Sequence, residues 1–156
     1  MRISGVAALA FVLATGAQAQ TPDADAFFNR FQTGDCAGYE ALADRALAPK
    51  GDLKDAGPFL AVSVGGCAAR AGRLDVAEQL GEQFFTARPA FSDDHLSVLV
   101  RRYGVIVSDV PDGGPVAARV LDRFMAVLPP DQTARLSLGE AHAMALFAAG
   151  RAGEGR

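Results

Sequence analysis

The chain contains two histidines, and each lies near carboxylates in the sequence. His95 directly follows Asp93 and Asp94, and His142 comes two residues after Glu140. A helical metal site places its ligands on one face, for example at positions i and i+4. Residues that are adjacent or two apart point in different directions, so these groups do not form a ligand set. We expect His95 to lie in the first turn of a helix, His142 to be packed or half-exposed, and neither to bind a metal.

The sequence has no motif of an enzyme active site. No serine lies in a Gly-x-Ser-x-Gly turn, and neither a Gly-x-Gly-x-x-Gly loop nor a phosphate loop with Lys occurs. The carboxylates are spread over helix faces without a paired acid and base. We therefore expect no catalytic residue and no cofactor. A small enzyme or a small-molecule binder with a pocket between helices stays as the alternative function.

Two adjacent arginines suggest a binding site for a partner protein. Arg101, Arg102 and Tyr103 interrupt the most apolar segment of the chain. Two guanidinium groups and a phenol can bind a carboxylate of a partner peptide. The alternative is that both arginines only solvate one side of an otherwise buried helix. We take these three residues, together with Phe59 in another predicted helix, as candidate partner-binding residues.

The first nineteen residues have the pattern of an export signal. Arg2 precedes an apolar run from Ile3 to Ala14, and Ala17-Gln18-Ala19 matches the small-x-small pattern of a cleavage site. The run has about a dozen residues, fewer than the roughly 20 that span a bilayer. We predict cleavage near Ala19 and a periplasmic or secreted protein.

Charge narrows the class of partner. Arg2 is the only charged residue before the predicted cleavage point, so the net charge changes from −3 to −4 on cleavage. A mildly acidic chain is a poor candidate for binding nucleic acid or anionic lipid, since both require a basic face. No second uncharged apolar stretch of membrane length follows, so we expect no stable membrane insertion. The expected partner is another protein or peptide of the cell envelope.

Helix signals divide the remaining chain into seven segments. Apolar residues recur with the 3.6-residue period of a helix, and glycines and prolines mark the ends. The segment Leu96–Val110 is so continuously apolar that a buried strand is also possible; we predict a helix because its neighbours are helical. The predicted helices lie between Pro22 and Gly34, Asp35 and Pro49, Gly57 and Gly72 (with a weak point at Gly65-Gly66), Arg73 and Arg88, Ser92 and Val110, Pro115 and Leu128, and Asp131 and Ala149.

Two cysteines in an exported protein indicate one disulfide. Cys36 lies at the start of the second predicted helix and Cys67 near the end of the third. If these helices pack antiparallel around a connection near Gly51-Asp52, the cysteines stand equally far from the turn and face each other. We predict a Cys36–Cys67 disulfide with a structural role, because no Cys-x-x-Cys spacing is present. The alternative is two buried free thiols.

Glycine, alanine and proline recur at matching offsets. Gly72 and Gly113 are each followed by an alanine five residues later and a proline seventeen residues later. Gly34 and Gly150 end other predicted helices, and the four glycines are 38, 41 and 37 residues apart. A period of this size over paired helices is typical of stacked helical hairpins.

With these residues, the segment 71–89 resembles the second half of a tetratricopeptide repeat. In that family a Gly ends the first helix, a small Ala lets the second helix pack closely, and a Pro ends the unit. Gly65 falls seven residues before Gly72, where the family has a small residue. The chain departs from the family at Gly81, where a large apolar residue is preferred, and in its spacing, which exceeds the family's 34 residues. The resemblance implies peptide or protein binding on a concave face formed by the first helices.

The sequence therefore predicts an all-α protein with a signal peptide at 1–19, one domain at 20–150 and a flexible tail at 151–156. About seven helices are expected to stack as antiparallel hairpins in a tetratricopeptide-like solenoid; the alternative is a compact helical bundle. An open stack would favour peptide binding. A closed bundle with a deep pocket near His95 or His142 would favour the enzyme or small-molecule binder.

Overall fold

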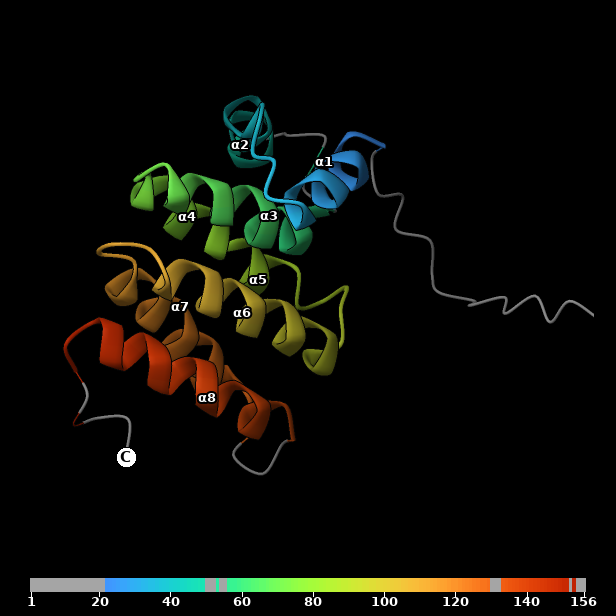
Figure 1. Ribbon diagram of the computed structural model, residues 1–156. Helices are drawn as coiled ribbons and strands as arrows, with labels where there is room; N and C mark the ends of the chain where they lie inside the picture. Colours follow the sequence, from blue (N-terminus) through green and yellow to red (C-terminus); the bar gives the residue numbers. More distant parts are fainter. Residues whose placement is uncertain (1–21, 50–52, 54–55, 130–132, 152, 154–156) are drawn as a thin grey trace, which may run out of the picture.

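The computed structural model describes residues 22–49, 53, 56–129, 133–151 and 153, and these are helical or in turns and loops, with no strand among them (Figure 1). Seven helices have eight residues or more, and α5 is a helix of four residues, so the predicted all-α fold with about seven helices is confirmed. The predicted export signal at 1–19 and most of the predicted tail lie outside the described residues. The helices are α1 Pro22–Gln32, α2 Tyr39–Leu47, α3 Gly57–Arg70, α4 Leu74–Gly81, α5 Gln83–Thr86, α6 Asp93–Ser108, α7 Gly114–Val127 and α8 Thr133–Ala148.

The helices are stacked in chain order, from α1 and α2 at one end to α8 at the other (Figure 1). Helices α1, α3, α6 and α8 pack in sequence against one another, and we call them the first layer. Helices α2, α4 and α7 also pack in sequence and form the second layer. The layers are joined by close packing of α2 and α4 on α3 and of α7 on α6 and α8. Each pair of neighbours thereby buries apolar stripes that neither helix could cover alone.

The segment Leu96–Val110 is helical, as α6. The buried residues Leu96, Val100, Tyr103 and Val107 recur every three or four positions and form one stripe. Because α6 packs against α3, α7 and α8, it is covered on more than one side. That position explains why the segment is so continuously apolar. Its predicted N-cap is confirmed, since the Ser92 hydroxyl accepts a hydrogen bond from the backbone N–H of His95 at 3.3 Å.

Two predicted helix boundaries were wrong. The second helix begins at Tyr39 and not at Asp35, because the Asp35 carboxylate accepts a hydrogen bond from the Ala37 N–H at 2.9 Å and stabilises a turn instead. The fourth predicted helix is divided into α4 and α5 after Gly81. A Cβ at Gly81 would lie 2.9 Å from Val120 Cγ2, so this glycine allows α4 to approach α7 closely.

Glycines end several helices as predicted, with one exception. Gly34, Gly72 and Gly150 have φ of 86°, 77° and 75°, the left-handed conformation that ends helices. At the fourth position of the repeat, Gly113 has φ −78° and Asp112 takes the left-handed conformation with φ 59°. A Cβ at Gly113 would lie 1.9 Å from the Val107 carbonyl oxygen. Gly113 is therefore required for close packing of the chain and not for a positive φ.

The predicted disulfide is present. Cys36 and Cys67 are bonded, with 5.5 Å between their Cα atoms, and they close a loop of 31 residues. Cys36 lies in the segment between α1 and α2, and Cys67 lies in the last turns of α3. The predicted connection at Gly51-Asp52 lies outside the described residues. The bond therefore fixes the C-terminal end of α1 and the start of α2 to α3.

Candidate functional site

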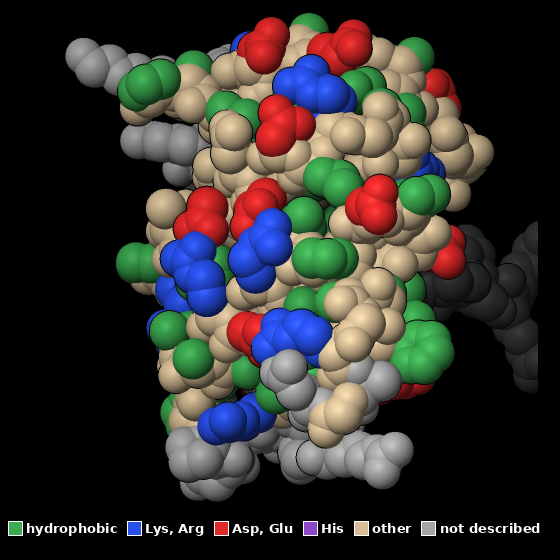
Figure 2. All heavy atoms as spheres, turned by 90° about the vertical axis from the view of Figure 1, so that its left-hand side faces the viewer, with side chains coloured by type: hydrophobic (Ala, Val, Ile, Leu, Met, Phe, Trp, Pro, Cys, Tyr) green, Lys and Arg blue, Asp and Glu red, His purple; other side chains and the backbone are tan. Residues whose placement is uncertain are grey.

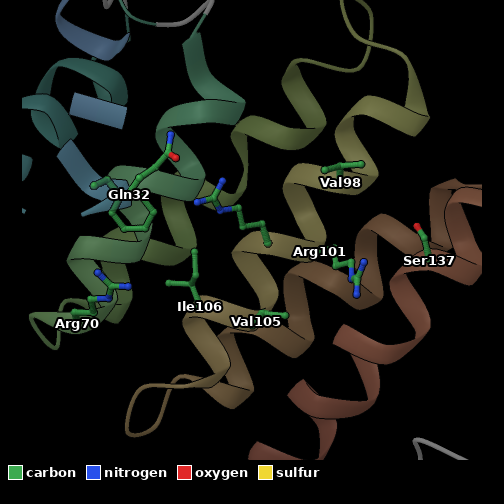
Figure 3. Close-up of a pocket in the computed structure, with 9 residues that line it drawn as sticks. Gln32, Arg70, Val98, Arg101, Val105, Ile106 and Ser137 are labelled. Atoms are coloured by element: carbon green, nitrogen blue, oxygen red, sulfur yellow. The ribbon is translucent and has the colours of Figure 1, made fainter. Parts of the chain in front are cut away.

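A groove of about 540 Å³ crosses the first layer (Figure 3). This volume lies within the range of roughly 300 to 1,000 Å³ that is typical of ligand sites. All its lining residues come from α1, α3, α6 and α8, and none comes from the second layer. They are Phe31, Gln32, Arg70, Val98, Arg101, Arg102, Val105, Ile106 and Ser137.

The apolar part of the groove depends on a close contact between α3 and the helices beside it. A Cβ at Gly66 would lie 3.0 Å from Ile106 Cγ2 and 3.1 Å from the Phe31 ring, so glycine is what lets these groove residues meet over α3. At Gly65 a Cβ would stand 3.4 Å from the Tyr103 ring. α3 continues unbroken through Gly65 and Gly66, the pair at which a weak point was predicted.

Three arginines border the groove, and among the residues that the structure describes no acidic one does. The Arg70 guanidinium lies over the Phe31 ring, 5.1 Å from its centroid. Arg102 lies over the Phe28 ring at 5.4 Å. Phe28 and Phe31 are three residues apart on α1, so they are neighbours on the same side of that helix. α1 therefore orients the guanidinium groups of two other helices through cation–π contacts.

Arg101 is in a different situation from the other two arginines. Its Nη2 donates to Glu140 Oε2 on α8 at 3.1 Å. Both side chains are half-exposed or more, so the ion pair contributes little to stability. Among the described residues, no carboxylate forms an ion pair with Arg70 or Arg102. The groove thus combines apolar side chains with guanidinium groups whose charge is not neutralised within the site.

Of the sequence-predicted binding residues, the structure places Arg101 and Arg102 at the groove and Tyr103 away from it. Tyr103 is fully buried and cannot contact a partner. Its hydroxyl donates to the Ala77 carbonyl oxygen at 2.8 Å, and its ring packs edge-on against Phe84. Burial raises the pKa of Tyr103 far above its ordinary value. The helical period explains the difference, because residue 103 belongs to the buried stripe of α6 that also contains Val100 and Val107.

Phe59 lies beside the groove but does not line it. It is half-buried and packs edge-on against Phe28 and Phe91, with ring centroids 6.1 and 6.2 Å apart. It also lines a second hollow of about 330 Å³, which it shares with Asp25 and Phe28 among others. Phe28 thus contacts Arg102 of the groove and Phe59 of the second hollow.

Neither histidine borders the groove or the second hollow. His95 is exposed in the first turn of α6. His142 on α8 is half-buried, and its Nε2 lies 2.5 Å from Asp122 Oδ1 on α7. No group of three or more potential metal ligands occurs in the residues that the structure describes. The His142–Asp122 contact, which the sequence reasoning did not find, joins α7 to α8.

Ion pairs join α4 and α7 of the second layer. Glu78 on α4 accepts two hydrogen bonds from Arg119 on α7, at 2.6 and 2.8 Å. Glu82 pairs with Arg123 one turn further along both helices. Figure 2 shows the side of the molecule on which these helices lie, where acidic and basic side chains are neighbours. This face neutralises its own charge, in contrast to the groove.

The groove residues missed by the sequence reasoning include Arg70, which carried a usable signal. Arg70 is the only charged residue in the fourteen residues of α3, and it lies in the last turn. Val98 and Val105 are 65% and 36% exposed although they belong to an apolar segment. Val98 lies one helical turn before Arg101 and Val105 one turn after Arg102, so the helical period places both valines on the charged face of α6. The position of α6 within the layer determines that this face borders the groove.

Comparison of the chain with protein-family models, with curated proteins and with solved structures found no match. None of the helices in the described part of the chain combines the length and the apolar character needed to cross a membrane.

Proposed function

We propose that this protein is an exported, non-catalytic module that binds a protein or peptide segment in the groove of its first layer. The observation that carries the proposal is the groove itself, with exposed valines and three arginines contributed by successive helices. A surface that combines exposed apolar side chains with arginines is typical of sites that bind other proteins. The groove also extends over α1, α3, α6 and α8, which suits an elongated ligand.

The proposal includes a tetratricopeptide-like arrangement of hairpins. It is supported by the two layers, by the 41-residue offset between Gly72 and Gly113, and by the same offset between the ion-paired residues of α4 and α7. In such a stack, the first helix of each hairpin contributes to one continuous face. Export to the periplasm or beyond rests on the signal pattern of residues 1–19 and is part of the proposal.

The alternative of a small enzyme or small-molecule binder required a deep pocket near a histidine. His95 and His142 do not line the groove, and its lining in the described part of the chain contains no carboxylate that could act as an acid or base. Its side chains offer apolar contact and anion binding and no nucleophile–base pair. Peptide binding therefore accounts for more of the site than catalysis does.

Site-specific photo-crosslinking in cells tests the proposal. A photoreactive amino acid is placed at Val98 or at Val105 in the groove. The matched control is Val127 on α7, which is 43% exposed and lies on the second layer. We expect discrete crosslinked products with an envelope protein from both groove positions and none of these products from position 127.

Two results would contradict the proposal. One is the absence of any crosslinked product from both groove positions when the variants are exported at the normal level. The other is the same set of products from all three positions, which would indicate non-specific contact. Mass spectrometry of the crosslinked products identifies the partner and the residues joined.

A further inference from the structure

The charge of the groove is opposite to that of the chain. The described part of the chain borders the groove with Arg70, Arg101 and Arg102 and with no acidic residue, whereas the whole chain has a net charge of −3. Elsewhere, most arginines of the described residues pair with carboxylates, as between α4 and α7. Like charges concentrated in a hollow produce a local potential that attracts ligands of the opposite charge. The ligand of this groove is therefore expected to be anionic.

Arg70 and Arg102 are oriented before any ligand arrives. Each guanidinium lies over a phenylalanine of α1, Arg70 over Phe31 and Arg102 over Phe28. A guanidinium that packs on a ring keeps the N–H groups at its edge available for hydrogen bonds to a carboxylate. Because the stacking contacts already restrict both side chains, less conformational entropy is lost when a ligand binds.

The apolar part of the groove separates a peptide from a simple anion as the ligand. Val98 and Val105 expose their side chains on α6, one helical turn before and after Arg101 and Arg102. A small inorganic anion would leave this apolar surface in water. A neutral peptide would cover it but could offer the guanidinium groups only uncharged acceptors such as backbone carbonyl oxygens, which bind them more weakly than a carboxylate does. Only a ligand with both kinds of group satisfies the whole groove.

Resting on the peptide binding proposed above, we infer that the groove binds an acidic, extended peptide segment of another protein. Carboxylates of the segment pair with Arg70 and Arg102, and at least one neighbouring apolar side chain packs on Val98 and Val105. Arg101 provides a further anchor, since its exposed pair with Glu140 can exchange for a ligand carboxylate.

The test selects ligands without assuming their charge. A display library of random linear peptides is selected on the purified protein, and Kd values of the enriched peptides are measured by fluorescence anisotropy. The groove variant is the double substitution Arg70→Glu and Arg102→Glu. The control is Arg73→Glu with Arg135→Glu, which changes the net charge equally at positions that do not line the groove. Thermal unfolding of both variants checks the fold.

We expect enriched peptides to contain Asp or Glu next to an apolar residue. The groove variant should bind them at least about tenfold more weakly, and the control variant should differ from the wild type by less than about twofold. Peptides in which Lys replaces the acidic residues should bind the groove variant more tightly than the wild type. This gain shows that the variant is folded.

Other outcomes overturn the inference and distinguish it from the proposed function. If the enriched peptides are neutral or basic and a Val98→Asp variant still abolishes their binding, peptide binding stands and the acidic ligand is wrong. If no enriched peptide responds to Val98→Asp, peptide binding in the groove is wrong as well. If vesicles containing phosphatidylglycerol bind in an Arg70- and Arg102-dependent manner and the peptides do not, the anionic ligand is a lipid surface.

Discussion

Glu78 and Arg119 are 41 residues apart in the sequence and form a two-hydrogen-bond ion pair between α4 and α7. Their separation equals that of Gly72 and Gly113, so each residue stands six positions after the glycine of its own hairpin. Glu82 and Arg123 repeat the relationship one turn later. Equivalent positions in successive hairpins therefore carry opposite charges, and the pairs fix the register in which the second layer stacks.

The Glu78–Arg119 pair makes stability depend on pH in the acid range. Hydrogen bonding from Arg119 holds the pKa of Glu78 below its ordinary value of 4.5. The stabilisation is therefore fully present above that value and is lost as the pH falls through the lowered pKa. We expect Glu78→Gln to reduce the free energy of unfolding by about 0.5 to 1 kcal/mol at pH 7, because the pair is partly exposed. Urea denaturation at pH 7 and at pH 3 should show this difference shrinking, and an equal difference at both values would contradict it.

Tyr103 should not ionise in the folded protein. Desolvation raises its pKa well above the ordinary 10.0, so the neutral phenol stays favoured in the native state while an unfolded chain ionises near the ordinary value. Stability is therefore lost as the pH rises above about 10. In a Tyr39→Phe variant Tyr103 is the only tyrosine. The change in ultraviolet absorbance at alkaline pH then measures the ionisation of Tyr103 alone. Its ionisation should coincide with the loss of far-ultraviolet circular dichroism; ionisation that precedes unfolding would show that Tyr103 is accessible.

The disulfide should stabilise both the fold and the groove. Closing a loop of 31 residues stabilises by roughly 3 to 4 kcal/mol in the chain-entropy model. A Cys36→Ser, Cys67→Ser variant should lose about this amount of unfolding free energy. Cys36 follows α1, and α1 supplies Phe31 of the groove and Phe28, the ring under Arg102. Loss of the disulfide should therefore increase amide hydrogen exchange in α1 more than in α7 and α8. A uniform increase over all helices would show that the bond does not act locally on the groove.

Two helical glycines provide a matched test of the packing beneath the groove. A Cβ added at Gly139 would meet no atom within 4 Å, whereas one added at Gly66 would press against Ile106 and Phe31. Replacement by Ala in a helix gains roughly 0.5 to 1 kcal/mol from propensity alone. We expect Gly139→Ala to raise the melting temperature and Gly66→Ala to leave it unchanged or lower it. Equal stabilisation by both substitutions would show that the space between α3 and the helices α1 and α6 accommodates a methyl group at position 66.

Local sequence signals accounted for most of the helices and for the disulfide. Ser92, Gly34 and Gly72 act as the caps and terminators that their residue types indicate. The cysteine pairing could be predicted because it depended on only two adjacent helices and their common turn. The wrong boundaries have local causes too. Asp35 stabilises a turn instead of a helix start. The break between α4 and α5 follows Gly81, a glycine that also lets α4 approach α7 closely.

The candidate site was only partly predictable. Arg101 and Arg102 were found because charges stand out in an apolar segment, yet the adjacent Tyr103 is in the core. Phe31, Arg70 and Ile106 come from three helices that are far apart in the sequence. No spacing within one segment relates them to one another. Their meeting depends on how closely α3 approaches its neighbours, and Gly66 allows that approach because a Cβ there would press against Phe31 and Ile106.

The sequence alone determines the helices, the disulfide between Cys36 and Cys67 and the period of the stack. These features follow from hydrogen bonding and side-chain spacing within one or two segments of the chain. Which side of each helix remains open to solvent depends instead on tertiary packing. A helix in contact with three others, as α6 is, is apolar on more than one face. The packing of the layers leaves Val98 at the groove and Val100 in the core, and it brings Arg70 and Arg102 onto the phenylalanines of α1.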